Sequence, residues 1–134
     1  MERVAGERVL VVEDESKIAE IVKLYLEREG YKVAVCGDGK VALDLFSREP
    51  PDLVVLDLML PGLDGLEVCK RIRQESKVPV VMLTAKSDRT DRIGGIETGA
   101  EAYLTKPFDA VELRATLNTL LAQRRILQEK FSRQ

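Results

Sequence analysis

The stretch LVVLDLMLPGLDG, residues 53–65, decides the fold of this 134-residue chain. Its first four residues form an uninterrupted apolar run, which is typical of a parallel β-strand covered on both faces. Asp57 closes that run, and Pro61 and Gly62 then turn the chain. The stretch therefore predicts a carboxylate held rigidly at the end of a buried strand, beside a loop.

The composition is that of an ordinary globular protein, with 45% hydrophobic and 33% charged residues and a formal net charge of −2. This charge gives no electrostatic reason to expect direct binding of nucleic acid or of an anionic membrane. No apolar stretch approaches the roughly 20 residues that cross a bilayer, and the N-terminus has no signal-peptide core. We therefore expect one domain in the cytoplasm.

The chain contains two cysteines, Cys36 and Cys69, and no histidine. The cysteines form no CxxC motif and are interpreted as small apolar residues. The lack of histidine excludes histidine-dependent catalytic triads and histidine-ligated zinc. A metal in this protein would have oxygen ligands, which favours a hard cation such as Mg²⁺.

Short apolar runs alternate with segments of helical periodicity along the chain. The apolar runs predict five strands, over residues 8–13, 31–35, 53–57, 80–84 and 102–105. A strand–helix unit repeated five times, with right-handed crossovers, gives an α/β fold with a doubly wound parallel sheet.

Helices are predicted between these strands from the spacing of apolar residues. The expected buried faces are Ile18, Ile21, Val22 and Tyr25 in the first helix, Val41, Ala42, Leu45 and Phe46 in the second, and Leu66, Cys69 and Ile72 in the third. Gly30 is expected to stop the first helix, and Asp64 to cap the third. A fourth helix is expected over residues 88–98, stopped by Gly99, and a fifth from about Asp109.

Four side chains with reactive or ligand-binding groups fall at the carboxyl ends of predicted strands: Asp14, Asp57, Thr84 and Lys106. In doubly wound sheets that edge forms the functional crevice. Crowded carboxylates favour either raised pKa values or a bound divalent cation. A hydroxyl and an ammonium group there could bind phosphoryl oxygens, so the set predicts phosphoryl transfer to a carboxylate, with Asp57 as the nucleophile.

Four segments in the same order resemble the receiver domain of two-component response regulators. They are VLVVEDE at 9–15, DLMLPGLDG at 57–65, LTA at 83–85 and YLTKPF at 103–108. The resemblance covers about residues 8–121 and implies a flavodoxin-like (βα)5 fold with strand order 2-1-3-4-5. It also implies a signalling switch, not an enzyme in the ordinary sense, that promotes its own phosphorylation and dephosphorylation.

The resemblance implies a Mg²⁺ site and a phosphoacceptor. Asp57 would accept the phosphoryl group from a sensor histidine kinase or phosphotransfer protein. Asp14, Asp57 and the backbone carbonyl of Met59 would bind Mg²⁺ directly, and Glu13 would act through water.

Further residues receive roles from the same resemblance. Thr84 and Lys106 would bind the phosphoryl oxygens, and the Lys106-Pro107 peptide bond would be cis. Thr84 and Tyr103 would form a switch pair that shifts the face built by the fourth helix, the last strand and the last helix. A non-phosphorylated, receiver-like interaction domain is the alternative function.

Each of these residues also has a purely structural interpretation. Asp14 could cap the helix that begins near Ser16, and Tyr103 could be a core residue. Thr84 is a β-branched residue of a kind common in strands, and a lysine such as Lys106 is usually a solvated surface charge. Their convergence at one edge favours the functional interpretation.

Two positions depart from the large winged-helix DNA-binding branch of the family. That branch commonly has an aspartate where this chain has Ala102, and an arginine where it has Thr116. Because those two residues pair across a dimer in that branch, the departures put that dimer in doubt.

The sequence predicts three segments: an N-terminal extension over 1–7, a receiver domain over 8–122 and a helical extension over 123–134. Coiled-coil spacing favours a homodimer through the C-terminal helix and a link to an output module outside this chain. The residues with this spacing are Leu113, Leu117, Leu120, Arg124, Leu127 and Phe131. A helix folded back onto its own domain and a frayed tail are the alternatives.

Overall fold

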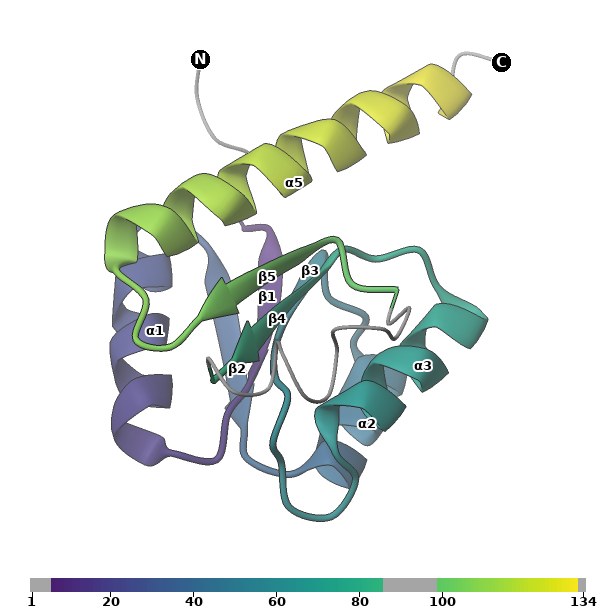
Figure 1. Ribbon diagram of the computed structural model, residues 1–134. Helices are drawn as coiled ribbons and strands as arrows, with labels where there is room; N and C mark the ends of the chain where they lie inside the picture. The colour runs from purple at the N-terminus through teal and green to yellow at the C-terminus, as the bar shows by residue number, and fades with distance from the viewer. Residues whose placement is uncertain (1–5, 86–98, 133–134) are drawn as a thin grey trace.

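Five parallel strands form one sheet in the computed structural model, which describes residues 6–85 and 99–132 (Figure 1). The strand order is β2-β1-β3-β4-β5, which confirms the predicted flavodoxin-like topology. The strands are β1 (Arg8–Val12), β2 (Lys32–Cys36), β3 (Leu53–Asp57), β4 (Val80–Thr84) and β5 (Ala102–Thr105).

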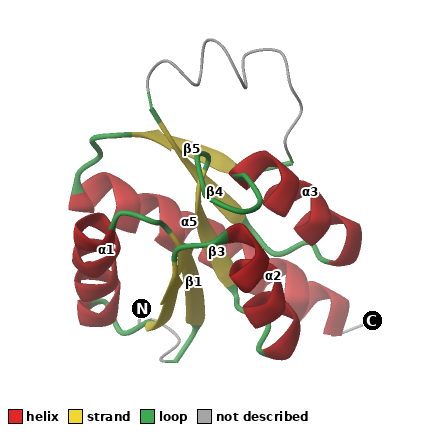
Figure 2. Ribbon diagram, turned by 90° about the horizontal axis from the view of Figure 1, so that it is seen from below, coloured by secondary structure: helices red, strands yellow, loops and turns green. Residues whose placement is uncertain are grey.

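Helices cover both faces of the sheet, as Figure 2 shows for α1 on one side and for α2 and α3 on the other. The described helices are α1 (Ser16–Arg28), α2 (Gly39–Arg48), α3 (Gly65–Glu75) and α5 (Ala110–Ser132). Helices α1 and α5 enclose one apolar cluster with the sheet, and α2 and α3 enclose the other. The sheet is thus the middle layer of three.

Burial explains why the central strands carry unbroken apolar runs. Every residue of β3 and of β4 is buried, whereas the edge strand β2 is largely exposed. A strand with helices on both faces needs apolar side chains at successive positions rather than at alternate ones. The predicted bounds of β3, β4 and β5 are confirmed, while β1 ends one residue earlier and β2 begins and ends one residue later than predicted.

The predicted inner faces of two helices were partly wrong. In α1 the buried residues are Ala19, Val22 and Leu26, whereas Ile21 is 54% and Tyr25 is 41% exposed. In α2, Ala42 and Phe46 are buried, but Val41 is 46% exposed. These helices carry apolar residues on two neighbouring stripes, and only the stripe spaced by three and four residues meets the sheet.

Helix α5 is continuous from Ala110 to Ser132, and its C-terminal end extends past the sheet (Figure 1). Leu113, Leu117 and Leu121 are fully buried in the cluster that α5 shares with α1. The first half of the predicted coiled-coil seam is therefore core of this domain, which corrects the interpretation of residues 113–131 as one seam. Leu127, farther along, is 55% exposed.

Two arginines attach the later part of α5 to the residues that directly precede β1 and β3. Arg124 Nη1 donates to the Asp52 backbone oxygen at 2.9 Å and to Asp52 Oδ1 at 3.0 Å. Arg125 Nη2 donates to Glu7 Oε1 at 2.6 Å. Up to Arg125, the alternative of a helix packed on its own domain describes α5 better than a coiled coil.

The predicted fourth helix, over residues 88–98, lies outside the described residues, as do most of the N-terminal extension and the last two residues. None of the helices in the described ranges has the length and apolar character needed to cross a membrane.

Candidate functional site

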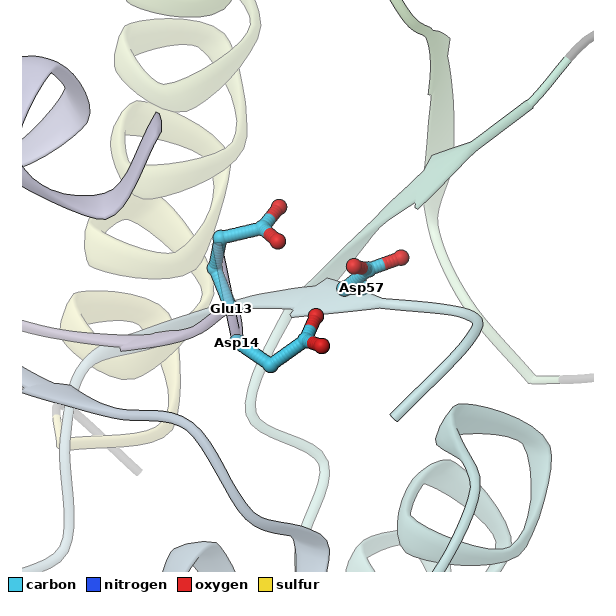
Figure 3. Close-up of side chains that lie close together, drawn as sticks. All are labelled: Glu13, Asp14 and Asp57. Carbon is cyan, nitrogen blue, oxygen red and sulfur yellow. The ribbon is translucent and has the colours of Figure 1, made fainter. Parts of the chain in front are cut away.

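Three carboxylates meet where β1 and β3 end. Glu13 and Asp14 follow β1, Asp57 closes β3, and the register pairs Val12 with Leu56. One carboxylate oxygen from each of the three acids lies within 4.8 Å of those of the other two. Figure 3 shows the Glu13 and Asp14 side chains extending towards Asp57. The sequence prediction that these residues gather at one edge is confirmed.

The three carboxylates differ in their contact with solvent. Glu13 is 2% and Asp57 is 5% exposed, whereas Asp14 lies on the surface. Hard cations such as Mg²⁺ take carboxylate oxygens as ligands and retain waters, so two buried and one open carboxylate fit such an ion. The donor set at this edge is therefore compatible with Mg²⁺.

The backbone after β3 holds Asp57 in place. The Met59 N–H donates to Asp57 Oδ1 at 3.1 Å, and the Gly65 N–H donates to the Leu58 oxygen at 2.8 Å. A Cβ atom on Gly65 would lie 2.4 Å from the backbone oxygen of Asp57 and 2.7 Å from the Leu58 Cα. Only glycine lets the start of α3 approach the end of β3 this closely.

Asp64 and Asp14 show how the local structure separates caps from site residues. Asp64 is the N-cap of α3, and its Oδ1 accepts from the Glu67 N–H at 3.1 Å, as predicted. The N-cap of α1 is Glu15, and its side chain makes no capping hydrogen bond. The structural alternative for Asp14, a helix cap, is therefore wrong.

Lys106 lies directly after β5 and reaches the acidic cluster. Its Nζ is 3.0 Å from Asp57 Oδ2 and 2.9 Å from Glu13 Oε1. The contact with Asp57 is a hydrogen bond, while the contact with Glu13 is an ion pair without hydrogen-bond angles. The Lys106-Pro107 peptide bond is cis. Lys106 is thus a partly buried cation shared by two carboxylates, not a solvated surface charge.

Burial and charge shift the pKa values in this cluster. Burial raises the pKa of Glu13 from 4.5 to about 7, against the lowering effect of Lys106. Burial also lowers the pKa of Lys106, but the carboxylates of Glu13 and Asp57 outweigh it, so the net shift is upwards. Lys106 therefore remains an ammonium group at neutral pH.

Thr84 closes β4, the strand next to β3. Its side chain is fully buried, and its Oγ1 has no hydrogen-bond partner among the residues that the structure describes. The backbone oxygen of Thr84 accepts from the Lys106 N–H at 2.7 Å, which joins the ends of β4 and β5. A buried hydroxyl without a partner is unfavourable unless a ligand completes it.

Two other predicted residues have clear positions but no tested role. Tyr103 is partly buried and packs against the cluster under α2 and α3, which agrees with its structural interpretation. Met59 lies in the loop after β3 and is 53% exposed. The switch role of Tyr103 and the metal-ligand role of the Met59 carbonyl stay predictions.

The sequence interpretation missed Glu15. Its Oε1 lies 3.7 Å from Lys106 Nζ, so three carboxylates surround one ammonium group. The signal was present in the run of three acids, Glu13, Asp14 and Glu15, directly after β1. Its meaning depended on Lys106, which is distant in the sequence.

Comparisons with known proteins agree with this geometry. Residues 9–118 match the family model of the response regulator receiver domain. The chain is 50% identical over 115 residues to the probable transcriptional regulator ycf27 of Porphyridium aerugineum, covering 86% of this chain and 48% of the relative. It is 48% identical over 126 residues to the ycf27 protein of Guillardia theta, covering 94% and 49%. The chain thus spans about half the length of these curated relatives.

Solved structures show the same fold. A putative response regulator from Chloroflexus aurantiacus has a TM-score of 0.81 and 38% identity, covering 87% of this chain and 98% of that one. The BeF3-activated N-terminal receiver domain of Klebsiella pneumoniae RstA has a TM-score of 0.79 and 34% identity, covering 86% and 98%. Because the family model spans most of the chain and the acidic edge has the expected geometry, this chain belongs to the response regulator receiver domain family.

Proposed function

We propose that Asp57 accepts a phosphoryl group from a sensor histidine kinase or a phosphotransfer protein and that Mg²⁺ is required. One observation carries this proposal: Lys106 reaches Asp57 at an edge that also holds two other carboxylates. Family membership supports a phosphorylation-dependent role in a two-component system.

The residues of the chain divide the work of in-line phosphoryl transfer. Asp57 is the nucleophile: its Oδ1 accepts from the Met59 N–H, and its Oδ2, which accepts from Lys106 in this structure, would attack phosphorus as Lys106 turns to the phosphoryl oxygens. Lys106 and the Thr84 hydroxyl, which has no hydrogen-bond partner among the described residues, would bind the equatorial phosphoryl oxygens. Asp14, Asp57 and the Met59 carbonyl would hold Mg²⁺, with Glu13 acting through water; bound there, the ion would neutralise charge that develops on the phosphoryl oxygens.

The effect of the modification would pass through Thr84 and Tyr103 to the face that contains β5 and α5. We propose that residues 8–122 form the switch and that residues 123–134 continue as a helix towards an output module. The relatives of about twice this length are described as probable transcriptional regulators, which supports a separate output module. The switch would also promote its own dephosphorylation.

A direct test is incubation with Mg²⁺ and acetyl phosphate, followed by intact mass measurement. Wild-type protein should gain one phosphate, and Asp57→Asn should gain none. Asp44→Asn is a matched control, because Asp44 is an exposed carboxylate whose ion pair is with Arg48 on the same helix. No gain in the wild-type protein under any condition would sink the proposal and favour the non-phosphorylated interaction domain.

A further inference from the structure

Three carboxylate groups lie near the ammonium group of Lys106, which is also the group expected to bind a phosphoryl oxygen. Its Nζ lies 2.9 Å from Glu13, 3.0 Å from Asp57 and 3.7 Å from Glu15. Only the contact with Asp57 is a hydrogen bond, and the contacts with Glu13 and Glu15 are electrostatic attractions. A phosphoryl group at Asp57 must therefore attract the Lys106 ammonium against the pull of the Glu13 and Glu15 carboxylates.

Of the three carboxylates, Glu15 is held least firmly at Lys106. The Glu15 side chain is 64% exposed, whereas the Glu13 side chain is fully buried and that of Asp57 is 6% exposed. The backbone N–H of Glu15 donates to Glu13 Oε2 at 3.1 Å, which fixes the Glu15 backbone beside the cluster. The Glu15 carboxylate is thus kept near Lys106 but is solvated, and an exposed ion pair of this kind is weak.

We propose that Glu15 is a positioning residue that draws the Lys106 ammonium away from the phosphoryl site and slows phosphorylation of Asp57. The inference rests on the proposed function of Asp57. In the reaction with acetyl phosphate, an Asp57 carboxylate oxygen forms a bond to phosphorus while the bond from phosphorus to the acetate oxygen breaks. Acetate leaves with the bonding electron pair, and no proton transfer is needed.

Glu15 acts on this step in two ways that have the same sign. It competes with the phosphoryl oxygens for Lys106, and it places a negative charge near an incoming dianion. Its effect on Mg²⁺ has the opposite sign, because a nearby negative charge strengthens binding of a divalent cation. Removing the charge should therefore raise the rate at saturating Mg²⁺ and lower the affinity for Mg²⁺.

The test compares Glu15→Gln with Glu20→Gln, which makes the same charge change at an exposed glutamate within α1. At saturating Mg²⁺ and low salt, Glu15→Gln should react with acetyl phosphate about two- to five-fold faster than Glu20→Gln. The difference should nearly vanish at about 0.5 M salt, where the Debye length is only about 4 Å. Glu15→Asp keeps the charge and should react at close to the wild-type rate.

A second readout does not involve the reaction. NMR titration of the unmodified proteins should give a Mg²⁺ dissociation constant about two-fold higher for Glu15→Gln than for Glu20→Gln. Equal phosphorylation rates in the two variants, or a slower rate in Glu15→Gln at saturating Mg²⁺, would overturn the role of Glu15 alone. Absence of phosphorylation in the wild-type protein would overturn the proposed function as well, so the two failures are distinguishable.

Discussion

The ammonium group of Lys106 lies 3.0 Å from the carboxylate of Asp57. Asp57 ends β3 and Lys106 follows β5, and β4 lies between these two strands in the sheet. The contact therefore joins the ends of β3 and β5 across the end of the intervening strand. It places a fixed positive charge beside a buried carboxylate in the unmodified protein.

Lys106→Met should destabilise the metal-free protein by about 1–3 kcal/mol, because the buried Glu13 and Asp57 carboxylates lose their shared cation. Mg²⁺ should restore more stability to this variant than to the wild-type protein, since the metal no longer competes with an ammonium group. Urea unfolding with and without Mg²⁺ measures both effects.

Lys70→Met, at an exposed position of α3, is the control for loss of a lysine charge. Equal urea midpoints for the Lys106 variant, the Lys70 variant and the wild-type protein would show that the cation has no role in holding the cluster together.

Thr84→Val should leave the unmodified protein as stable as the wild type, or more stable by up to about 1 kcal/mol, because it removes a buried hydroxyl that no described residue hydrogen-bonds. The same variant should gain less stability on phosphorylation, since the hydroxyl is the group expected to bind a phosphoryl oxygen. Melting temperatures before and after acetyl phosphate treatment measure this difference.

Thr105→Val is the matched control, because Thr105 pairs with Thr84 in the register of β4 and β5. If Thr84→Val is clearly less stable than wild type before phosphorylation, the Thr84 hydroxyl already stabilises the unmodified protein, which would contradict this prediction.

Gly65→Ala should lower the free energy of unfolding by about 1–3 kcal/mol. The new Cβ would lie 2.4 Å from the backbone oxygen of Asp57, so the backbone must move. Phosphorylation should slow in parallel, since that movement displaces the nucleophile. Gly37→Ala, whose Cβ would lie 3.3 Å from the Asp14 Cα, should have a smaller effect on unfolding. A Gly65 variant with wild-type stability and phosphorylation would show that the close approach has no role.

Much of the fold could be predicted because its signals are local. The unbroken apolar run that ends at Asp57 reports burial on both faces, and the end of a parallel strand defines the functional edge. The prediction failed where two local patterns compete. Ile21 is as apolar as the buried residues of α1, and Tyr25 has a large apolar ring, so only the position of the sheet decides which stripe is covered.

The tail of α5 illustrates a different limit. Leu113 and Leu117 are compatible with both a coiled-coil seam and a helix packed on a sheet, because both patterns place apolar residues on one helical stripe. The partner of Arg124 is Asp52, which is 72 residues away in the sequence. Local spacing carries no information about such a contact, and the same holds for Glu15 and Lys106.

The two interpretations of α5 differ in the role of Leu127. Leu117→Ala should cost about 2–5 kcal/mol because Leu117 is fully buried in the domain core. Leu127→Ala should change the unfolding free energy by less than about 0.5 kcal/mol, since Leu127 is 55% exposed. Urea unfolding and sedimentation equilibrium check this pair. Dissociation of a dimer by Leu127→Ala would support the coiled coil instead.

The arginine contacts of α5 and the acidic site occupy opposite ends of the same two strands. Glu7, which binds Arg125, precedes β1, and Asp52, which binds Arg124, precedes β3. At their other ends β1 leads to Glu13 and Asp14, and β3 closes with Asp57. Five residues of extended chain span about 17 Å, and neither strand contains a glycine or a bulge that could absorb a displacement. Any movement of β1 or β3 along its own axis would therefore displace both the acidic cluster and the part of α5 that Arg124 and Arg125 attach.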